Sequence, residues 1–182
     1  MRLPFARPVD SGEAPKPIDA AVAALRFEGP ARELLHRYKF ARALHLRADL
    51  ADYLEAAVMA GLDSAAVDAV LPLPIRRLHR WDRGYDQSVY LARDLARRID
   101  RRCGEGVLAR TGSPKRQSSL PAAERQENVR GTIVVRRPGQ VRGRTILVVD
   151  DIMTTGATLS ECARVLKESG VARVWCATVA RV

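Results

Sequence analysis

The chain has 182 residues, 47% of them hydrophobic, which is enough to bury one sizeable core and indicates a single globular unit. It carries 31 Lys and Arg against 21 Asp and Glu, a formal net charge of +10, and only four of the basic residues are lysines. No apolar run is long enough to span a membrane and the first residues lack the apolar stretch of a secretory signal, so we expect a cytoplasmic protein.

The first 20 residues contain several prolines among small and polar residues, which predicts a flexible N-terminal segment and a folded domain at residues 21–182. In that domain, stretches of strand length alternate with stretches of helical period. This order predicts an α/β fold with a mostly parallel central sheet flanked by helices. Strands are expected at residues 21–27, 67–73, 132–135, 145–149 and 174–179, and helices at residues 31–37, 44–59 and 87–102.

The helix expected at residues 87–102 has two unlike faces. Leu91, Leu95 and Ile99 recur on one face and predict the buried side. The opposite face carries Arg93, Arg97, Arg98 and Arg101. Arginine suits bidentate phosphate binding, but its abundance beside so much alanine also fits a compositional bias of the genome. Charge alone therefore leaves nucleic-acid contact open, with this helix and the loop at Lys115 and Arg116 as candidate surfaces.

The stretch at residues 145–158 joins a strand pattern to a helix start. Residues 146–149 are an uninterrupted apolar run, typical of a central parallel strand covered on both faces. Asp150 and Asp151 follow at its expected carboxyl end, where open α/β sheets bind ligands. Apolar residues at one-face spacing from Leu159 to Leu166 then predict a helix, and Gly170 is its stop signal.

The turn between the acidic pair and this helix is built for an anion. Thr154, Thr155 and Thr158 offer hydroxyl groups, Gly156 can adopt unusual backbone angles, and the new helix exposes its first N–H groups. A phosphate there would lie close to two carboxylates that can bind hydroxyls, which together describe a 5-phosphorylated ribose. Ordinary helix capping is the plainer alternative. A response-regulator receiver is excluded, because its paired aspartates open the domain, whereas only one helix and one strand follow here.

Residues 149–158, Val-Asp-Asp-Ile-Met-Thr-Thr-Gly-Ala-Thr, resemble the phosphoribosyl pyrophosphate (PRPP) loop of the type I phosphoribosyltransferases. The resemblance implies the fold of that superfamily. It also implies that Asp150 and Asp151 hold the ribose 2′- and 3′-hydroxyls as catalytic and PRPP-binding residues. The implied PRPP-binding turn consists of Met153, Thr154, Thr155, Gly156, Ala157 and Thr158.

Two further blocks resemble one family within that superfamily, the ComF-type competence proteins and the related GntX proteins. Residues 71–87 are similar to its Pro-x-Pro loop followed by Arg-Gly-Phe-Asn-Gln. Residues 113–131 are similar to its Gln-x-x-Leu and Arg-x-x-Asn-Val-x-Gly stretch. Phe27-Glu-Gly29 and Tyr38-Lys-Phe40 also resemble the family's entry into this domain. The similarity covers most of the chain from about Phe27 onward.

The chain departs from this family at two places. The family usually begins with a tetracysteine zinc module, but the first cysteine here is Cys103, so neither the module nor zinc is expected. The three cysteines are widely spaced, which fits neither a metal site nor a disulfide framework and suits a reducing compartment. Asp86 stands where Asn is usual and Tyr85 where Phe is usual; a carboxylate there would weaken anion binding unless a cation neutralised it.

The resemblance extends to pyrophosphate and to a mobile flap. The residues implied at pyrophosphate are Pro74, Ile75, Arg76, Arg77 and Arg83. The implied flap carries Lys115, Arg116 and Gln117, and Lys115 is the only lysine between Lys39 and Lys167. Lys115 is therefore the candidate for a catalytic flap residue that touches pyrophosphate. A solvated basic loop explains the same charges equally well.

If the site is catalytic, the resemblance implies transfer of a phosphoribosyl group from PRPP with release of pyrophosphate. The transition state should resemble an oxocarbenium ion, so positioning and charge stabilisation dominate. The implied cofactor is Mg²⁺, bound through the substrate and not directly by the protein, as is common for this hard cation.

Two functions therefore remain open. The first is a phosphoribosyltransferase that acts on an unidentified base or amine and is linked to natural competence and DNA uptake. The second is a non-catalytic PRPP-sensing or single-stranded-DNA-handling accessory protein. The expected partners are PRPP, an acceptor, single-stranded DNA and the competence machinery, without membrane insertion; formation of a homodimer is left open. The sequence does not identify the acceptor.

Overall fold

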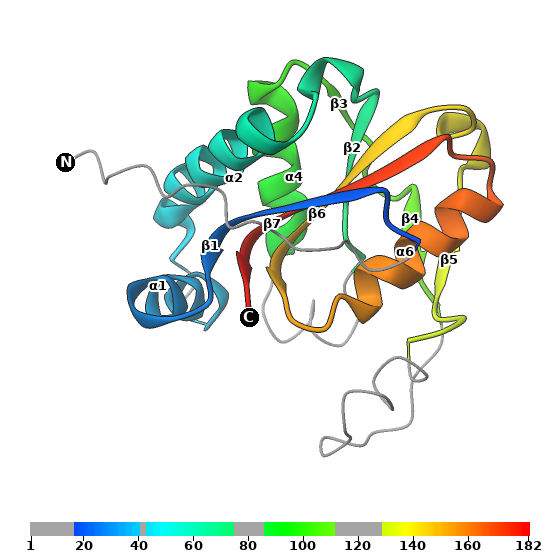
Figure 1. Cartoon of the computed structure of the whole chain (residues 1–182). Coiled ribbons are helices and arrows are strands. Elements are labelled where there is room, and N and C mark those ends of the chain that lie inside the picture. Colours follow the sequence, from blue (N-terminus) through cyan, green and yellow to red (C-terminus); the bar gives the residue numbers. More distant parts are fainter. Residues whose placement is uncertain (1–16, 41–42, 75–85, 112–128) are drawn as a thin grey trace.

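The computed structural model describes residues 17–40, 43–74, 86–111 and 129–182. Five strands form one sheet in the order β1-β7-β6-β2-β3, and every neighbouring pair is parallel. The expected α/β fold with a parallel sheet is confirmed (Figure 1). The strands are β1 (Ala20–Arg26), β2 (Ala69–Pro72), β3 (Arg102–Cys103), β6 (Thr145–Met153) and β7 (Arg173–Arg181).

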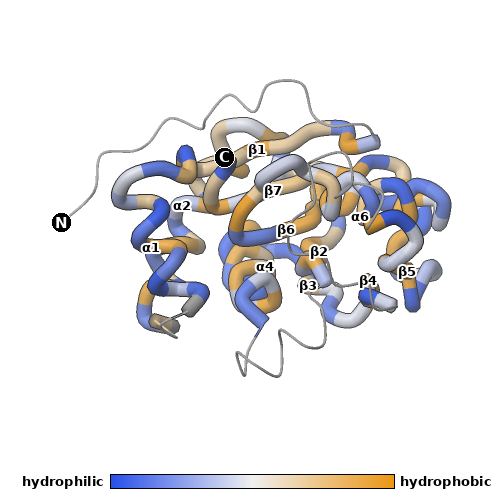
Figure 2. Tube along the Cα trace, turned by 90° about the horizontal axis from the view of Figure 1, so that it is seen from below, coloured by the Kyte–Doolittle hydropathy of each residue, from blue (hydrophilic) through white to orange (hydrophobic). Residues whose placement is uncertain are grey.

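Helices cover both faces of this sheet. The α-helices are α1 (Gly29–Phe40), α2 (Arg47–Gly61), α4 (Gln87–Arg98) and α6 (Ala157–Glu168). Leu147 and Val149 pack in the cluster that includes residues of α1, α2 and α4, whereas Ile146 and Val148 pack in the cluster that includes residues of α6. Side chains of a strand alternate between faces, so a strand covered on both sides is apolar throughout. Figure 2 shows these apolar strands between α4 and α6.

The central strand β6 is longer than predicted. The sequence predicted an end at Val149, with the acidic pair just beyond it. Instead β7 pairs with β6 along its whole length, with Asp150 opposite Thr178 and Met153 opposite Arg181. The predicted end was wrong because the first polar residues were taken as the end of the strand. The long neighbouring strand β7 continues to supply backbone hydrogen-bond partners beyond Val149. Asp150 and Asp151 are therefore the sixth and seventh of the nine residues of β6.

A second, two-stranded sheet lies beside the main one. β4 (Leu108–Arg110) pairs antiparallel with β5 (Ile133–Val135). A strand was predicted at residues 132–135, but its antiparallel partner was not, and neither was β3. Strands of two or three residues are too short for a period to be recognised in a sequence.

The helix ends differ from the prediction at two places. The helix predicted at 87–102 ends at Arg98, and Asp100 then takes a left-handed conformation with φ 54° before Arg102 begins β3. The helix predicted at 44–59 is a short 3₁₀ turn, Leu44–Leu46, followed by α2. Two further 3₁₀ turns span Ser64–Ala66 and Pro138–Gln140. Across the four described ranges, no helix combines the length and the apolar character needed to cross a bilayer.

Candidate functional site

The acidic pair is held by two different helices. Asp150 and Asp151 are consecutive in a strand, so their side chains leave it in opposite directions. The Oγ of Ser88, in the first turn of α4, donates a hydrogen bond of 2.9 Å to Asp150. The Nζ of Lys39, in the last turn of α1, lies 3.2 Å from a carboxylate oxygen of Asp151. Asp151 is only 6% exposed, so Lys39 supplies a counter-charge to a buried carboxylate.

Lys39 is placed there by a contact between the end of α1 and the start of α4. Tyr38 is fully buried and its hydroxyl lies 3.4 Å from the carbonyl oxygen of Gln87, to which it donates. The side-chain amide of Gln87 donates in return to the carbonyl oxygen of Lys39 at 3.2 Å. These reciprocal bonds fix the last turn of α1 above the acidic pair. Lys39 was not among the predicted site residues, although Tyr38-Lys-Phe40 had been noticed as a family-like motif.

The carboxyl group of Asp150 has unusual electrostatics. Its pKa is raised to about 8, first because the group is removed from water and second because Asp151 is its neighbour. The backbone N–H of Asp151, the Ser88 hydroxyl and the Lys39 ammonium oppose this rise in pKa. Near neutral pH the group can therefore carry a proton, so it can donate a hydrogen bond as well as accept one. A sugar hydroxyl is a matching partner, because it also donates and accepts.

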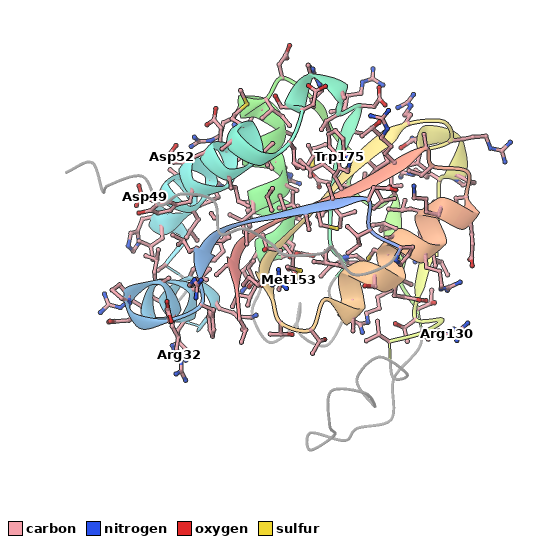
Figure 3. All side chains as sticks on the ribbon, viewed as in Figure 1. Arg32, Asp49, Asp52, Arg130, Met153 and Trp175 are labelled. Carbon is pink, nitrogen blue, oxygen red and sulfur yellow. The ribbon has the colours of Figure 1, made fainter. Side chains whose placement is uncertain are left out.

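A turn leads from the end of β6 into α6. Met153, labelled in Figure 3, is buried at the end of the strand, and the two residues after it, Thr154 and Thr155, are exposed. Gly156 has a left-handed backbone with φ 73° and precedes the first residue of α6, so a residue without Cβ is favoured there. The Oγ of Thr155 accepts a bond of 3.4 Å from the N–H of Ala157. The turn thus presents hydroxyls and the N-terminus of a 12-residue helix, the arrangement that suits phosphate.

The structure brings part of the predicted site together. The acidic pair and the turn, residues 150–158, form one strand–turn–helix unit. Pro74 lies near the same edge of the sheet, because the N–H of the preceding Leu73 donates to the carbonyl oxygen of Val149 at 2.9 Å. The remaining predicted residues lie outside the described ranges: Ile75, Arg76, Arg77, Arg83, Lys115, Arg116 and Gln117.

Asp86 has a structural role that the sequence did not reveal. Its side chain accepts a bond of 3.3 Å from the N–H of Val89 and caps the N-terminus of α4. An N-cap carboxylate satisfies an exposed helix donor and is favoured by the helix dipole. This role gives a physical reason for a carboxylate at that position, next to the helix whose first turn holds Asp150.

The acidic pair offers carboxylate oxygens, which are ligands that Mg²⁺ accepts. Within the ranges that the structure describes, no group of three His, Cys, Asp or Glu residues is close enough to hold a metal ion. The two carboxylates already contact Ser88 and Lys39. Mg²⁺ commonly binds through one or two carboxylates and substrate phosphates, and this donor set is compatible with such binding. The three cysteines are free thiols.

The predicted basic face of α4 is largely neutralised by acidic neighbours. Arg93 pairs with Glu105, Arg97 with Asp94, and Arg98 with Asp52 and Glu55. The guanidinium of Arg101 donates to the carbonyl oxygens of Asp100 and Ala65. The arginines of this helix thus stabilise the fold locally, and the face offers an incoming anion less charge than its sequence suggests.

The part of the chain that forms the candidate site is also similar to known proteins. The phosphoribosyl transferase domain family matches residues 86–182, which include α4, the acidic pair and the turn. The DNA utilization protein YhgH of Escherichia coli (strain K12) is 28% identical over 169 residues, covering 90% of this chain and 74% of that protein. Competence protein F of Haemophilus influenzae is 28% identical over 149 residues, covering 80% of this chain and 65% of that protein.

The fold also recurs in solved structures. The glutamine phosphoribosylpyrophosphate amidotransferase from B. subtilis, complexed with ADP and GMP, superposes with a TM-score of 0.53 at 22% identity. The superposition covers 80% of this chain and 30% of the amidotransferase. At this identity the likeness concerns the fold alone.

Proposed function

Because the chain belongs to the phosphoribosyl transferase domain family, in which its motifs and relatives identify it as a ComF-type member, we propose that it binds PRPP at the carboxyl end of β6. One observation carries the proposal: two carboxylates, held by Ser88 and Lys39, lie near the end of the strand that leads into a hydroxyl-rich turn at a helix N-terminus. The 5-phosphate would bind at the turn and the ribose hydroxyls at Asp150 and Asp151. The raised pKa of Asp150, which would allow its carboxyl group to donate as well as accept a hydrogen bond, supports the second part.

We further propose that the chain transfers the phosphoribosyl group to an acceptor and releases pyrophosphate. Mg²⁺, when bound with PRPP, would neutralise charge on the pyrophosphate leaving group. The protein's own contribution is to orient the sugar. Asp150 and Asp151 fix its hydroxyls, and the turn fixes its phosphate, so the anomeric carbon is presented in one geometry while positive charge develops on the ring. Pyrophosphate contacts by Pro74, Ile75, Arg76, Arg77 and Arg83, and a flap contact by Lys115, Arg116 and Gln117, stay predictions.

The cellular role that we propose is a cytoplasmic one, linked to DNA uptake. It is supported by the relatives named as a DNA utilization protein and a competence protein. The same names favour a second candidate function, in which the chain binds PRPP without transferring it and assists in handling single-stranded DNA. A homodimer and an acceptor of the base or amine class remain predictions of the sequence.

Thermal unfolding with PRPP and Mg²⁺ tests the binding proposal. A ligand that binds only the folded state stabilises it by about 2.7 kcal/mol at 100 times its Kd, so the melting temperature should rise with PRPP concentration. Asp150→Asn with Asp151→Asn should abolish the rise. No rise in the parent protein at any Mg²⁺ concentration would reject PRPP binding.

A pair of threonine variants separates binding from general stability. Thr155→Val removes a hydroxyl from the turn and should weaken PRPP binding. Thr178→Val is the matched control: its hydroxyl is buried without a hydrogen-bond partner in the described part of the chain, so the change should leave the apo protein as stable or more so. Equal loss of PRPP affinity in both would contradict the assignment of the turn. A screen of bases and amines for PRPP-dependent pyrophosphate release then distinguishes the transferase from the non-catalytic binder.

A further inference from the structure

A row of arginines lies at the amino-terminal edge of the sheet, opposite the acidic pair. Arg173 is the first residue of β7, Arg144 immediately precedes β6, and Arg102 is the first residue of β3. In a parallel sheet all strand starts meet at one edge, and neighbouring strands are about 4.8 Å apart. In Figure 3, Trp175 is labelled near this edge of the sheet, and Met153 is labelled at the opposite edge.

Backbone hydrogen bonds draw further arginines to this edge. The N–H groups of Ala172 and Arg173 both donate to the carbonyl oxygen of Arg144. The N–H of Gly143 donates to the carbonyl oxygen of Gly170, beside which the side chain of Arg142 lies. The 3₁₀ turn before Arg142 is preceded by Arg136 and Arg137. We call the set the arginine rim: Arg102, Arg136, Arg137, Arg142, Arg144 and Arg173.

The arginines of α4 are paired with acidic side chains, whereas in the described part of the chain the arginines of the rim are not. Within the described ranges, no side chain of the rim forms an ion pair, and all except the partly buried Arg144 are exposed. Two acidic residues close by, Asp19 and Glu168, are engaged elsewhere, whereas Asp68 before β2 and Asp100 before Arg101 are exposed carboxylates at the same edge. Asp19 and Glu168 pair with Lys167 and Arg164, and Asp68 accepts a hydrogen bond from the N–H of Thr145. The six arginines of the rim outnumber the two exposed carboxylates, so net positive charge is available to an external anion.

We propose that the arginine rim binds the sugar–phosphate backbone of single-stranded DNA, at a surface separate from the PRPP site. Guanidinium groups bind phosphate oxygens bidentately, and a row of them along strand starts complements a chain of regularly spaced charges. Contacts to phosphate oxygens alone carry no sequence information, so binding would depend little on the sequence of the DNA. Val134 is the one large, exposed apolar residue on a neighbouring strand, which favours a polyanion over a lipid surface.

The test compares two triple variants that lose the same charge. The rim triple is Arg142→Gln, Arg144→Gln and Arg173→Gln. The matched control, called the α4 triple, combines Arg93→Gln and Arg97→Gln on α4 with Arg101→Gln three residues after its end. Affinity for a labelled oligothymidylate is measured at several salt concentrations for the parent and both triples. Each phosphate neutralised on a single strand contributes about 0.7 to the slope of log K against log salt, so the rim triple should lose about 2 from that slope. The α4 triple should keep the parent's slope.

Several outcomes would overturn the proposal: an unchanged slope in the rim triple, an equal loss in the α4 triple, or no oligonucleotide binding by the parent at low salt. Rim-dependent binding to anionic lipid vesicles without binding to the oligonucleotide would also reject it.

A second rim triple with Lys at the same positions keeps the charge and should retain most of the slope, which controls for misfolding. The PRPP-induced rise in melting temperature should be equal in all variants. If the parent shows no such rise, the proposed PRPP function fails while the DNA result still stands on its own.

Discussion

Asp150 is a carboxyl group whose protonation depends on folding. Its pKa is raised in the folded protein, to about 8, chiefly by removal from water and by Asp151. The folded state then binds this proton more tightly than the unfolded chain, whose aspartate pKa is about 3.9. Stability contributed by the protonated group is complete below the unfolded pKa and is lost as the pH rises through the folded pKa.

We therefore predict that Asp150→Asn becomes more stable relative to the parent as the pH rises from about 4 to about 8. Asn cannot ionise, so the variant escapes the cost of a partly buried negative charge beside the buried Asp151. Denaturant unfolding of both proteins across this range measures the difference. A difference in unfolding free energy that stays constant with pH would contradict the raised pKa. The variant should nevertheless bind PRPP less well, because the diol loses a carboxylate.

The ion pair between Lys39 and Asp151 gives a second prediction at the residue scale. Lys39→Met leaves Asp151 buried without its counter-charge and should lower the free energy of unfolding by about 1 to 3 kcal/mol. The double variant with Asp151→Asn should recover most of this loss, because no charge then remains unpaired. Urea unfolding of the single and double variants measures the coupling.

The same helix offers the control for this cycle. Arg37 and Glu33 form an ion pair on α1, but their side chains are 65% and 67% exposed. Arg37→Met should therefore cost no more than about 0.5 kcal/mol. Similar losses in Lys39→Met and Arg37→Met would show that burial adds nothing to the Lys39 pair.

At the scale of elements, the junction of β6 and α6 depends on Gly156. Its φ of 73° is unfavourable for a residue with Cβ, so Gly156→Ala should cost about 1 to 2 kcal/mol and should also displace the helix start at which we propose that phosphate binds. Gly106→Ala is the matched control, since Gly106 has φ 70° and open space around its α-carbon, far along the chain from the turn.

Both glycine variants should lose similar stability in thermal melts, but only Gly156→Ala should lose PRPP-induced stabilisation. If Gly106→Ala lost the PRPP response as well, strain alone would explain the result and the turn would have no special part in binding.

Elements whose hydrophobic residues recur with a clear period could be predicted from the sequence. Features that depend on contacts between distant segments could not. The apolar run at residues 146–149 predicted the central strand, and the buried face of α4, with Leu91 and Leu95, followed from its spacing. The extension of β6 to Met153 depends on its pairing with β7. The amino-acid pattern of β6 itself does not reveal this pairing. The candidate site divides in the same way: the acidic pair and the turn are contiguous and were predicted, whereas Lys39 reaches them only because α1 contacts α4.

At the scale of the whole molecule, the start of the folded domain can be tested. A boundary at residue 21 was predicted, but Ile18 is 6% exposed and packs in the core. Asp19 accepts from the N–H of Val174 and pairs with Lys167, each at 2.6 Å. We propose that the domain begins at or before Ile18.

Two truncations distinguish these boundaries. Removal of residues 1–16 should leave the melting temperature within a few degrees of the parent. Removal of residues 1–20 should lower it clearly, because about 1.5 to 3 kcal/mol of apolar burial is lost with Ile18, together with the contacts of Asp19. Equal melting temperatures for the two truncated proteins would support the boundary at residue 21.

The length of β6 sets the distance between the arginine rim and the acidic pair, and therefore the strength of the electrostatic interaction between them. Arg144 precedes the strand and Asp151 lies near its end, so at 3.3 Å per residue they are about 20 Å apart. Salt at physiological strength screens exposed charges over about 8 Å. The electrostatic interaction between the two edges is therefore weak, and we predict that PRPP and single-stranded DNA bind simultaneously without competing. On these two proposals, a mutation that changes the charge at one edge should preserve the affinity at the other, so PRPP binding and DNA binding would evolve separately.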